Sequence, residues 1–187
     1  MDISSVFKTE VFRPIVITLV PGLMAVVPYL FIVHYYFPNI ASLFSKHSSA
    51  FIIVVLLVCI AFGQILEDFG SLIETAMWKW VVGSKHDNEI WNEFLRTHFV
   101  KEPIGLRYMR TIVLRMKFEN SFIAALCFFS AGIFWLGIVG FIGRHAHVLL
   151  ILAVTFLLIL YLAYESYESA KLLKEQRINL LKGVIVK

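Results

Sequence analysis

The sequence predicts an all-α, polytopic membrane protein with four transmembrane helices and helical extensions into the cytosol. Of its 187 residues, 59% are hydrophobic and only 16% are charged, and the mean hydropathy is +0.81. These values lie far from those of a soluble domain. One spanning helix needs about 20 mainly apolar residues. Windows of this kind occur at about 15–37, 50–66, 118–142 and 148–164, so we expect one membrane domain over 1–187 with cytosolic helical segments at 67–117 and 165–187.

The first expected span, 15–37, is distinguished by its prolines. Pro21 and Pro28 lie inside it, and each removes a backbone hydrogen bond and favours a kink. Pro38 follows the span, so we expect the helix to stop there and residues 40–49 to form a short connection.

The second span, 50–66, runs into polar sequence without a proline, so we expect the helix to continue beyond the lipid. Polar side chains then recur at spacings of three and four, at Gln64, Glu67, Asp68, Ser71 and Glu74. A helix would place them on one face. They form a candidate acidic cluster for a cation, a proton or a basic partner. The alternative is a solvated face whose acids pair with basic residues before the third span, at Arg107, Arg110, Arg115 and Lys117.

Residues 67–119 have cytosolic character, with eight acidic and eight basic side chains. Turn-forming residues at 83–88 precede an expected helix at about 89–99. Pro103 separates this helix from another, which is expected to begin near Gly105 and to run directly into the third span.

The third span, 118–142, carries a candidate helix-packing face of small residues. These are Gly132, Gly137, Gly140 and Gly143. Small residues allow two helix backbones to approach each other closely. The partner could be a neighbouring span of the same chain or another subunit, so the pattern is compatible with a homo-oligomer.

The fourth span, 148–164, is expected to continue as an amphipathic cytosolic helix over 165–187. Fifteen of the lysines and arginines fall on the side of the two termini and of residues 67–117, and two fall in the short loops. The positive-inside rule therefore predicts that both termini are cytoplasmic. This basic excess suits contact with membrane lipids, so we expect no nucleic-acid partner.

No motif of the sequence indicates catalysis. No nucleophile can be paired with a base, so we expect no enzyme, and no cofactor is indicated. Cys59 and Cys127 lie in separate apolar windows and are expected to be buried structural thiols. The histidines divide between the two sides of the membrane, so no metal site is expected either.

Three phrases of the sequence, at 21–25, 67–74 and 167–171, resemble those of small bacterial membrane proteins of unassigned activity. The layout of four spans with both ends inside is similar to that of the membrane subunit of the Kiwa anti-phage defence system. This resemblance implies a location in the bacterial inner membrane. It also implies a homo-oligomeric sensor whose cytosolic surface holds a soluble effector.

Two hypotheses of function follow. The first is a non-enzymatic sensor or scaffold that self-associates and docks a cytosolic partner through 67–117 and 165–187, with helix tilt at Pro21 and Pro28 as the moving part. The alternative is an oligomeric cation channel or pore-forming effector, in which Glu67, Asp68 and Glu74 form an acidic ring. A membrane enzyme acting on lipid is the least favoured.

Overall fold

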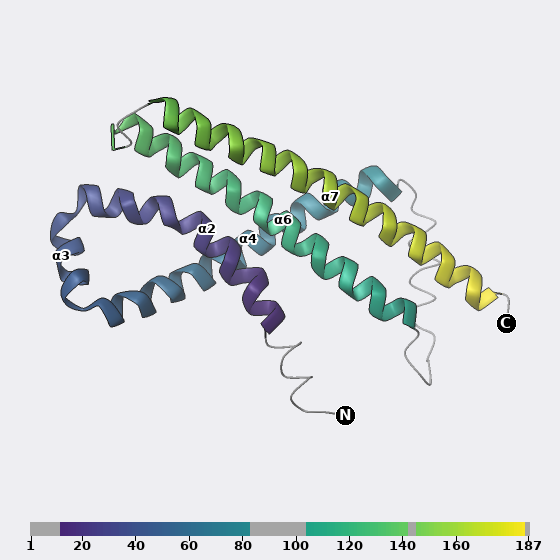
Figure 1. Cartoon of the computed structure of the whole chain (residues 1–187). Helices are drawn as coiled ribbons and strands as arrows, with labels where there is room; N and C mark the ends of the chain where they lie inside the picture. Colours follow the sequence, from purple (N-terminus) through teal and green to yellow (C-terminus); the bar gives the residue numbers. More distant parts are fainter. Residues whose placement is uncertain (1–11, 83–103, 142–144, 186–187) are drawn as a thin grey trace.

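The computed structural model describes residues 12–82, 104–141 and 145–185, and these parts of the chain are helical (Figure 1). The helices are α2 (Phe12–Tyr36), α3 (Pro38–Lys46), α4 (Ser48–Val82), α6 (Ile104–Ile138) and α7 (His145–Ile185). Four of them, α2, α4, α6 and α7, are long and apolar enough to cross a membrane. The predicted all-α fold with four spanning helices is therefore confirmed. The helix expected at 89–99 lies outside the described residues.

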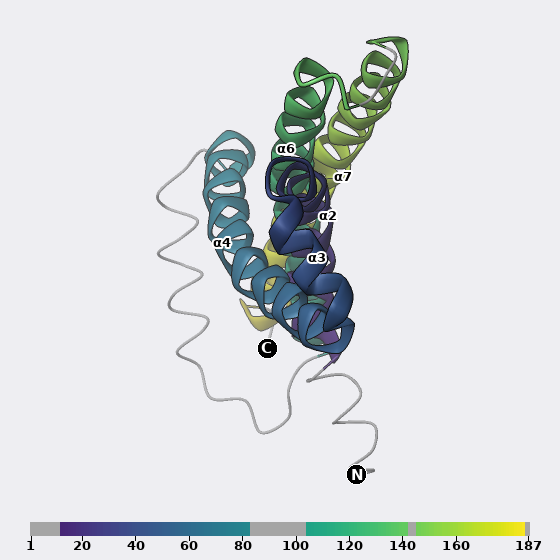
Figure 2. The ribbon, with the colours of Figure 1, turned by 90° about the vertical axis from the view of Figure 1, so that its left-hand side faces the viewer.

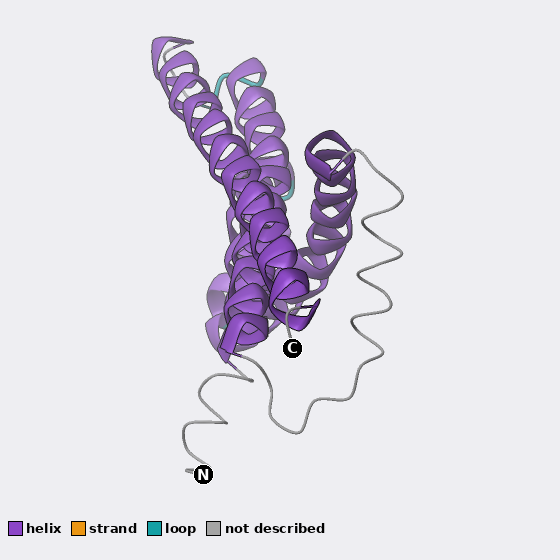
Figure 3. Ribbon diagram, turned by 90° about the vertical axis from the view of Figure 1, so that its right-hand side faces the viewer, coloured by secondary structure: helices purple, strands orange, loops and turns teal. Residues whose placement is uncertain are grey.

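The long helices form two hairpins. Helices α2 and α4 are joined through α3, and α6 runs beside α7 in the opposite direction (Figure 1). Helix α6 packs against each of α2, α4 and α7. We call the end with α3 and the α6–α7 connection the loop end. We call the opposite end, where α4 ends, α6 begins and α7 ends, the polar end. Figures 2 and 3 show that α4 ends to one side of α6 and α7.

The helices continue beyond the apolar windows because nothing in the sequence breaks them. Helix α4 runs to Val82, α6 begins at Ile104 and enters its apolar part without interruption, and α7 continues to Ile185. Pro21 and Pro28 both lie inside α2 and are buried. Residues 40–49 connect the first two spans, as expected, and most of them belong to a short helix. Pro38 starts the short helix α3, at a first-turn position where its missing N–H costs no hydrogen bond.

Helices α2 and α4 cross in direct backbone contact. A Cβ added to Gly22 would lie 1.9 Å from the carbonyl oxygen of Cys59, and a Cβ added to Gly63 would lie 1.9 Å from that of Thr18. Helix α4 also crosses α6 closely, since a Cβ on Gly70 would lie 2.8 Å from the backbone nitrogen of Ser121. Glycine is thus required at these crossings, as in other close helix pairs of membrane proteins.

The glycines of α6 do not form the predicted common face. A Cβ on Gly132 would meet Pro28 of α2 at 2.6 Å, whereas one on Gly137 would meet Val148 of α7 at 3.0 Å. These two glycines therefore serve two different neighbours within the chain. Gly143 lies outside the described residues.

Gly140 ends the helix instead of packing against one. Helix α6 stops at Ile138, before the expected boundary at 142, and Gly140 has a positive φ of 77°. Its N–H donates to the carbonyl of Gly137 (3.2 Å), and the N–H of Phe141 donates to that of Leu136 (3.1 Å). This pair of hydrogen bonds is the Schellman arrangement that satisfies the last carbonyls of a helix.

Candidate functional site

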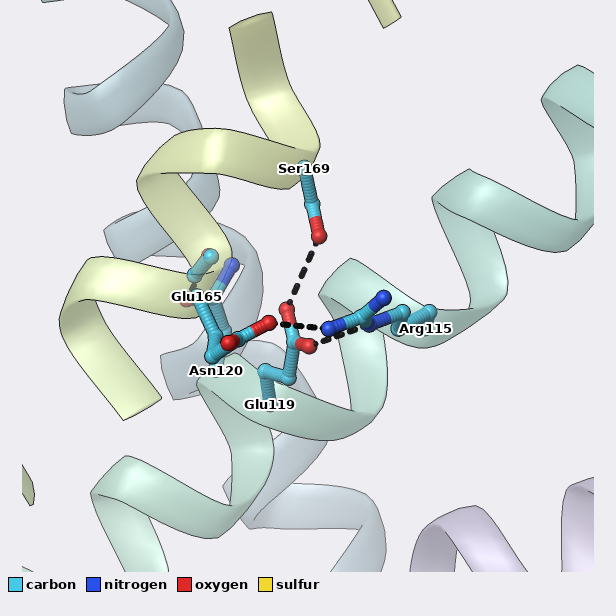
Figure 4. A network of polar contacts seen from close by, with 6 residues as sticks. Arg115, Glu119, Asn120, Glu165 and Ser169 are labelled. Atoms are coloured by element: carbon cyan, nitrogen blue, oxygen red, sulfur yellow. Dashed lines mark hydrogen bonds and ion pairs between the residues drawn. The ribbon is translucent and has the colours of Figure 1, made fainter. Parts of the chain in front are cut away.

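A polar network joins α6 to α7 about midway along the two helices (Figure 4). Arg115 Nε donates to Glu119 Oε1 at 2.7 Å, and the Arg115 guanidinium also binds the carboxylate of Glu165. Ser169 Oγ donates to the other oxygen of Glu119, Oε2, at 3.3 Å. Each helix contributes two of these residues one turn apart, which places their side chains on the facing sides of the hairpin.

The network buries a carboxylate but leaves its cation accessible. The side chain of Glu119 is 7% exposed, that of Glu165 is 25% exposed and that of Arg115 is 55% exposed. A buried charge is tolerated only when it is paired and hydrogen-bonded. Glu119 meets this requirement through Arg115 and Ser169, so its role here is to hold the two helices together.

A second buried polar contact joins the next residue of α6 to the next residue of α7. Ser166 Oγ donates to Asn120 Oδ1 at 2.8 Å, and both residues are completely buried. Ser121 is also completely buried and lies against Gly70, so α4 closes over this site. Within the described residues, Asn120 Nδ2 and Ser121 Oγ have no hydrogen-bond partner. The junction of α4, α6 and α7 is therefore polar and tightly packed.

Some residues of the predicted acidic cluster face the bundle, and others face away from it. Glu67 Oε1 lies 3.5 Å from Lys117 Nζ, and Glu74 is half-buried. Gln64 and Asp68, by contrast, are exposed on the outer side of α4. Ser71 Oγ donates to the backbone carbonyl of Glu67 at 3.0 Å, within its own helix. The five residues therefore do not converge on one site.

The four candidate basic partners also differ from one another. Lys117 contacts Glu67 of α4, but Arg115 binds carboxylates of α6 and α7 instead. Arg110 is exposed on α6. Arg107 belongs to α6 as well, but its side chain is not among those described. Of the predicted pairings, that of Glu67 with Lys117 is present, whereas Arg115 pairs with Glu119 and Glu165, which lie outside the predicted cluster.

Sequence reasoning missed the residues that connect α6 to α7. These are Glu119, Asn120, Glu165, Ser166 and Ser169. A signal for them did exist, since polar side chains interrupt the two apolar windows at nearly equal distances along the chain from the turn between the helices. In an antiparallel hairpin, such positions lie opposite each other.

Beyond the network, an apolar core holds the ends of three helices together. Its buried members are Met109, Ile112, Met116, Ala170 and Leu173, with Trp78, Val81 and Val113 packed against them. The Arg177 guanidinium lies 4.3 Å from the centre of the Trp78 ring, a cation–π contact. Lys174 Nζ donates to the carbonyl of Val81 at 3.0 Å, at the end of α4 where cations are favoured. We call this part, made of the last turns of α4, the first turns of α6 and the last turns of α7, the three-helix extension.

The two cysteines differ in their surroundings. Cys59 is buried at the α2–α4 crossing, as expected, but the prediction of a buried Cys127 was wrong because this residue faces outward from α6. In the parts of the chain that the structure describes, no group of three His, Cys, Asp or Glu side chains is arranged to bind a metal ion.

The four candidate spans indicate a multi-pass membrane protein. Two of its ion pairs, Arg115–Glu165 and Lys117–Glu67, join different helices about midway along their length, an arrangement suited to fixing helix positions. No protein-family model, no curated protein and no solved structure matches this chain.

Proposed function

We propose that the protein is a non-enzymatic subunit of the bacterial inner membrane that self-associates and docks a soluble effector protein at the polar end. Both termini would be cytoplasmic, following the distribution of lysine and arginine. The observation that carries the proposal is the three-helix extension. Three helices are longer than a bilayer requires, and a core of their own holds them together.

Helix length supports this proposal. Helices α4 and α6 have 35 residues each and α7 has 41. At about 1.5 Å per residue, each exceeds 50 Å, whereas the hydrocarbon core is about 30 Å thick. If the helices stand upright, about two fifths of α4 and α6 and about half of α7 extend beyond the hydrocarbon. A rigid extension suits docking because little conformational freedom is lost when a partner binds.

The surface of the extension has the chemistry of a protein contact. Arg110 and Lys171 are exposed, as are Glu175 and the half-exposed ring of Tyr108. Tyrosine and arginine are enriched at protein interfaces, and charges of both signs set partner choice. This mixture favours a protein partner over a purely anionic one.

The position of the acids supports docking over the channel. A cation-selective ring requires carboxylates that face a pore. Glu67 Oε1 lies 3.5 Å from Lys117 Nζ. One of the three residues of the supposed ring is therefore paired with a cation of its own chain, which makes the channel the weaker proposal.

The contacts between the helices provide a route by which a signal would pass from α2 to the extension. The buried Pro28 of α2 lies against Gly132 of α6, and α6 carries the network that positions α7. A change in the tilt of α2 at Pro21 or Pro28 would therefore reach the extension through α6. By its resemblance in layout to the Kiwa membrane subunit, we place this sensing in anti-phage defence.

Photocross-linking in living cells tests the docking. A benzoylphenylalanine residue would replace Arg110 or Lys171 in the full-length protein, and Leu57, 61% exposed in the first third of α4, is the matched control. We expect the same soluble protein to be captured from both positions at the polar end and not from 57. Capture of lipid alone, or of the same protein from all three positions, contradicts docking there.

Self-association needs its own test. Much of α4 and α7 faces outward, since only 17% and 11% of their most apolar windows are buried within the chain. Native mass spectrometry of the protein released from lipid nanodiscs should show a defined oligomer. A monomer at every protein concentration contradicts this part of the proposal and leaves the cross-linking result unaffected.

A further inference from the structure

The outer side of α4 carries an apolar stripe that the bundle does not cover. Its members are Ile65, Phe69, Leu72, Ala76 and Trp80, and all five are exposed. Their spacing of three and four residues places them along one side of the helix. Leu72 is 67% exposed and Trp80 is 88% exposed. We call these five residues the α4 stripe.

The other residues of this part of α4 also differ in character from one side of the helix to another. Leu66, Gly70 and Trp78 face the bundle. An exposed polar row runs beside the stripe, through Gln64, Asp68, Thr75 and Lys79. The end of α4 is therefore attached to the bundle on one side and amphipathic on its free side. An amphipathic helix surface of this kind is typical of segments that lie in a membrane interface.

The stripe continues the apolar surface of the spanning part of α4. Val54, Val58 and Ala61 precede Ile65 at the same spacing and are exposed too. Nothing interrupts this surface between the middle of the span and Trp80. Since the helix is longer than the hydrocarbon is thick, an upright α4 would place Leu72 and Trp80 in water.

The position of α4 in the bundle allows it to be inclined in the membrane. It crosses behind α6 and α7 and ends to one side of them, so it can be inclined when they are not (Figures 1, 2 and 3). An inclined α4 would keep its stripe in contact with lipid along its whole length.

We propose that the α4 stripe lies on the lipid leaflet at the polar end, with Trp80 at headgroup level and Lys79 beside anionic headgroups. Tryptophan concentrates at this level of the membrane, and a lysine near the surface attracts anionic lipids. Asp68 and Thr75 remain in water on the neighbouring side. This site is independent of any soluble partner, because it uses the free side of α4 rather than the exposed residues of α6 and α7.

Environment-sensitive labels on the full-length protein test this placement. In a Cys59→Ala/Cys127→Ser background, single cysteines at Leu72 and Ala76 report on the stripe, and one at Thr75 is the matched control on the same turns. Each would carry an NBD label in lipid vesicles. Spin-labelled lipids should quench the labels at 72 and 76 several-fold more than the label at 75. Aqueous iodide should show the reverse order.

Two outcomes overturn the proposal. Equal iodide quenching at all three positions means that the stripe is in water. Protection from iodide without quenching by spin-labelled lipid means that protein covers it, either a second copy or another segment of this chain. Position 75 also guards against misfolding, since an unfolded variant would lose the difference between the two sides.

A lipid comparison tests the role of Lys79. Adding phosphatidylglycerol to phosphatidylcholine vesicles should shift the emission of the label at 76 further to the blue. Lys79→Gln should abolish this additional shift, whereas Lys171→Gln on α7 should leave it in place. An additional shift that survives Lys79→Gln contradicts the headgroup contact.

Discussion

At the scale of single residues, the junction of α4, α6 and α7 depends on a few buried polar atoms. Asn120 accepts a hydrogen bond from Ser166, and the neighbouring Ser121 hydroxyl has no partner among the described residues. Each unsatisfied buried polar group costs about 1–3 kcal/mol, whereas a satisfied one contributes about 1 kcal/mol. The Ser166 hydroxyl thus stabilises the fold, whereas the buried Ser121 hydroxyl destabilises it.

The first prediction compares these serines. Ser166→Ala leaves Asn120 Oδ1 without its donor and should lower the free energy of unfolding by about 1–3 kcal/mol. Ser121→Ala removes a hydroxyl that donates to nothing described and should cause no loss of stability. Unfolding by steric trapping in bicelles measures both. An equal loss in the two variants would show that the two serines do not differ in this way.

The second prediction concerns the pairing of Glu119. Arg115→Met keeps much of the apolar stem but leaves the buried carboxylate with only the Ser169 hydroxyl. Removing one partner of a buried ion pair typically costs 3–5 kcal/mol. Because the Arg115 side chain is 55% exposed, we expect a smaller loss of about 1–3 kcal/mol. The exposed Lys79→Met is the control, and a loss of the same size there would count against the special role of Arg115.

The sequence allowed only part of this site to be predicted. It indicated charged pairing near Glu67 and Lys117, which the structure places 3.5 Å apart. It did not indicate that Arg115 turns to Glu165, because that contact depends on the register between α6 and α7. One contribution to this register is the point at which α6 ends, and Gly140 caps the helix there.

At the scale of helices, continuity was predictable and packing was not. The lack of helix breakers after Leu66 predicted that α4 would continue, and it runs to Val82. The glycine spacing in α6 suggested one packing face, yet Gly132 meets α2 and Gly137 meets α7. Identical residues in one helix can serve different neighbours, and the sequence of one helix does not contain the positions of the others.

The third prediction separates packing from capping glycines. Gly63→Ala places a Cβ 1.9 Å from a backbone oxygen of α2, so the helices must move apart, and we expect a loss of about 3 kcal/mol or more. Gly140→Ala meets no neighbouring atom but must adopt a positive φ, which costs about 1–2 kcal/mol. Thermal melting in detergent measures both. Equal melting temperatures for Gly63→Ala and the unsubstituted protein would contradict the close crossing of α2 and α4.

At the scale of the whole molecule, the fold combines a loosely covered membrane part with a polar end that has a core of its own. The candidate span of α7 is 11% buried and that of α6 is 50% buried, so α6 is the central helix and lipid or other copies must cover the rest. Composition was sufficient to predict this class of fold. The core of the extension was not predictable, because Met109, Met116 and Leu173 come from helices whose relative positions depend on the register of the hairpin.

The last prediction tests whether the extension is a separate requirement for docking. Leu173 is 2% exposed in its core, whereas the adjacent Leu172 is 39% exposed. Leu173→Asp removes a buried leucine and introduces an unpaired charge, a change expected to cost at least about 2–5 kcal/mol locally. It should open the ends of α6 and α7 to proteolysis, leave membrane insertion intact and abolish capture of the soluble partner from Arg110 and Lys171. Leu172→Asp adds the same charge at the surface and should retain both protection and capture. If Leu173→Asp opens the extension but capture persists, the partner binds elsewhere, and docking at a rigid three-helix surface is wrong.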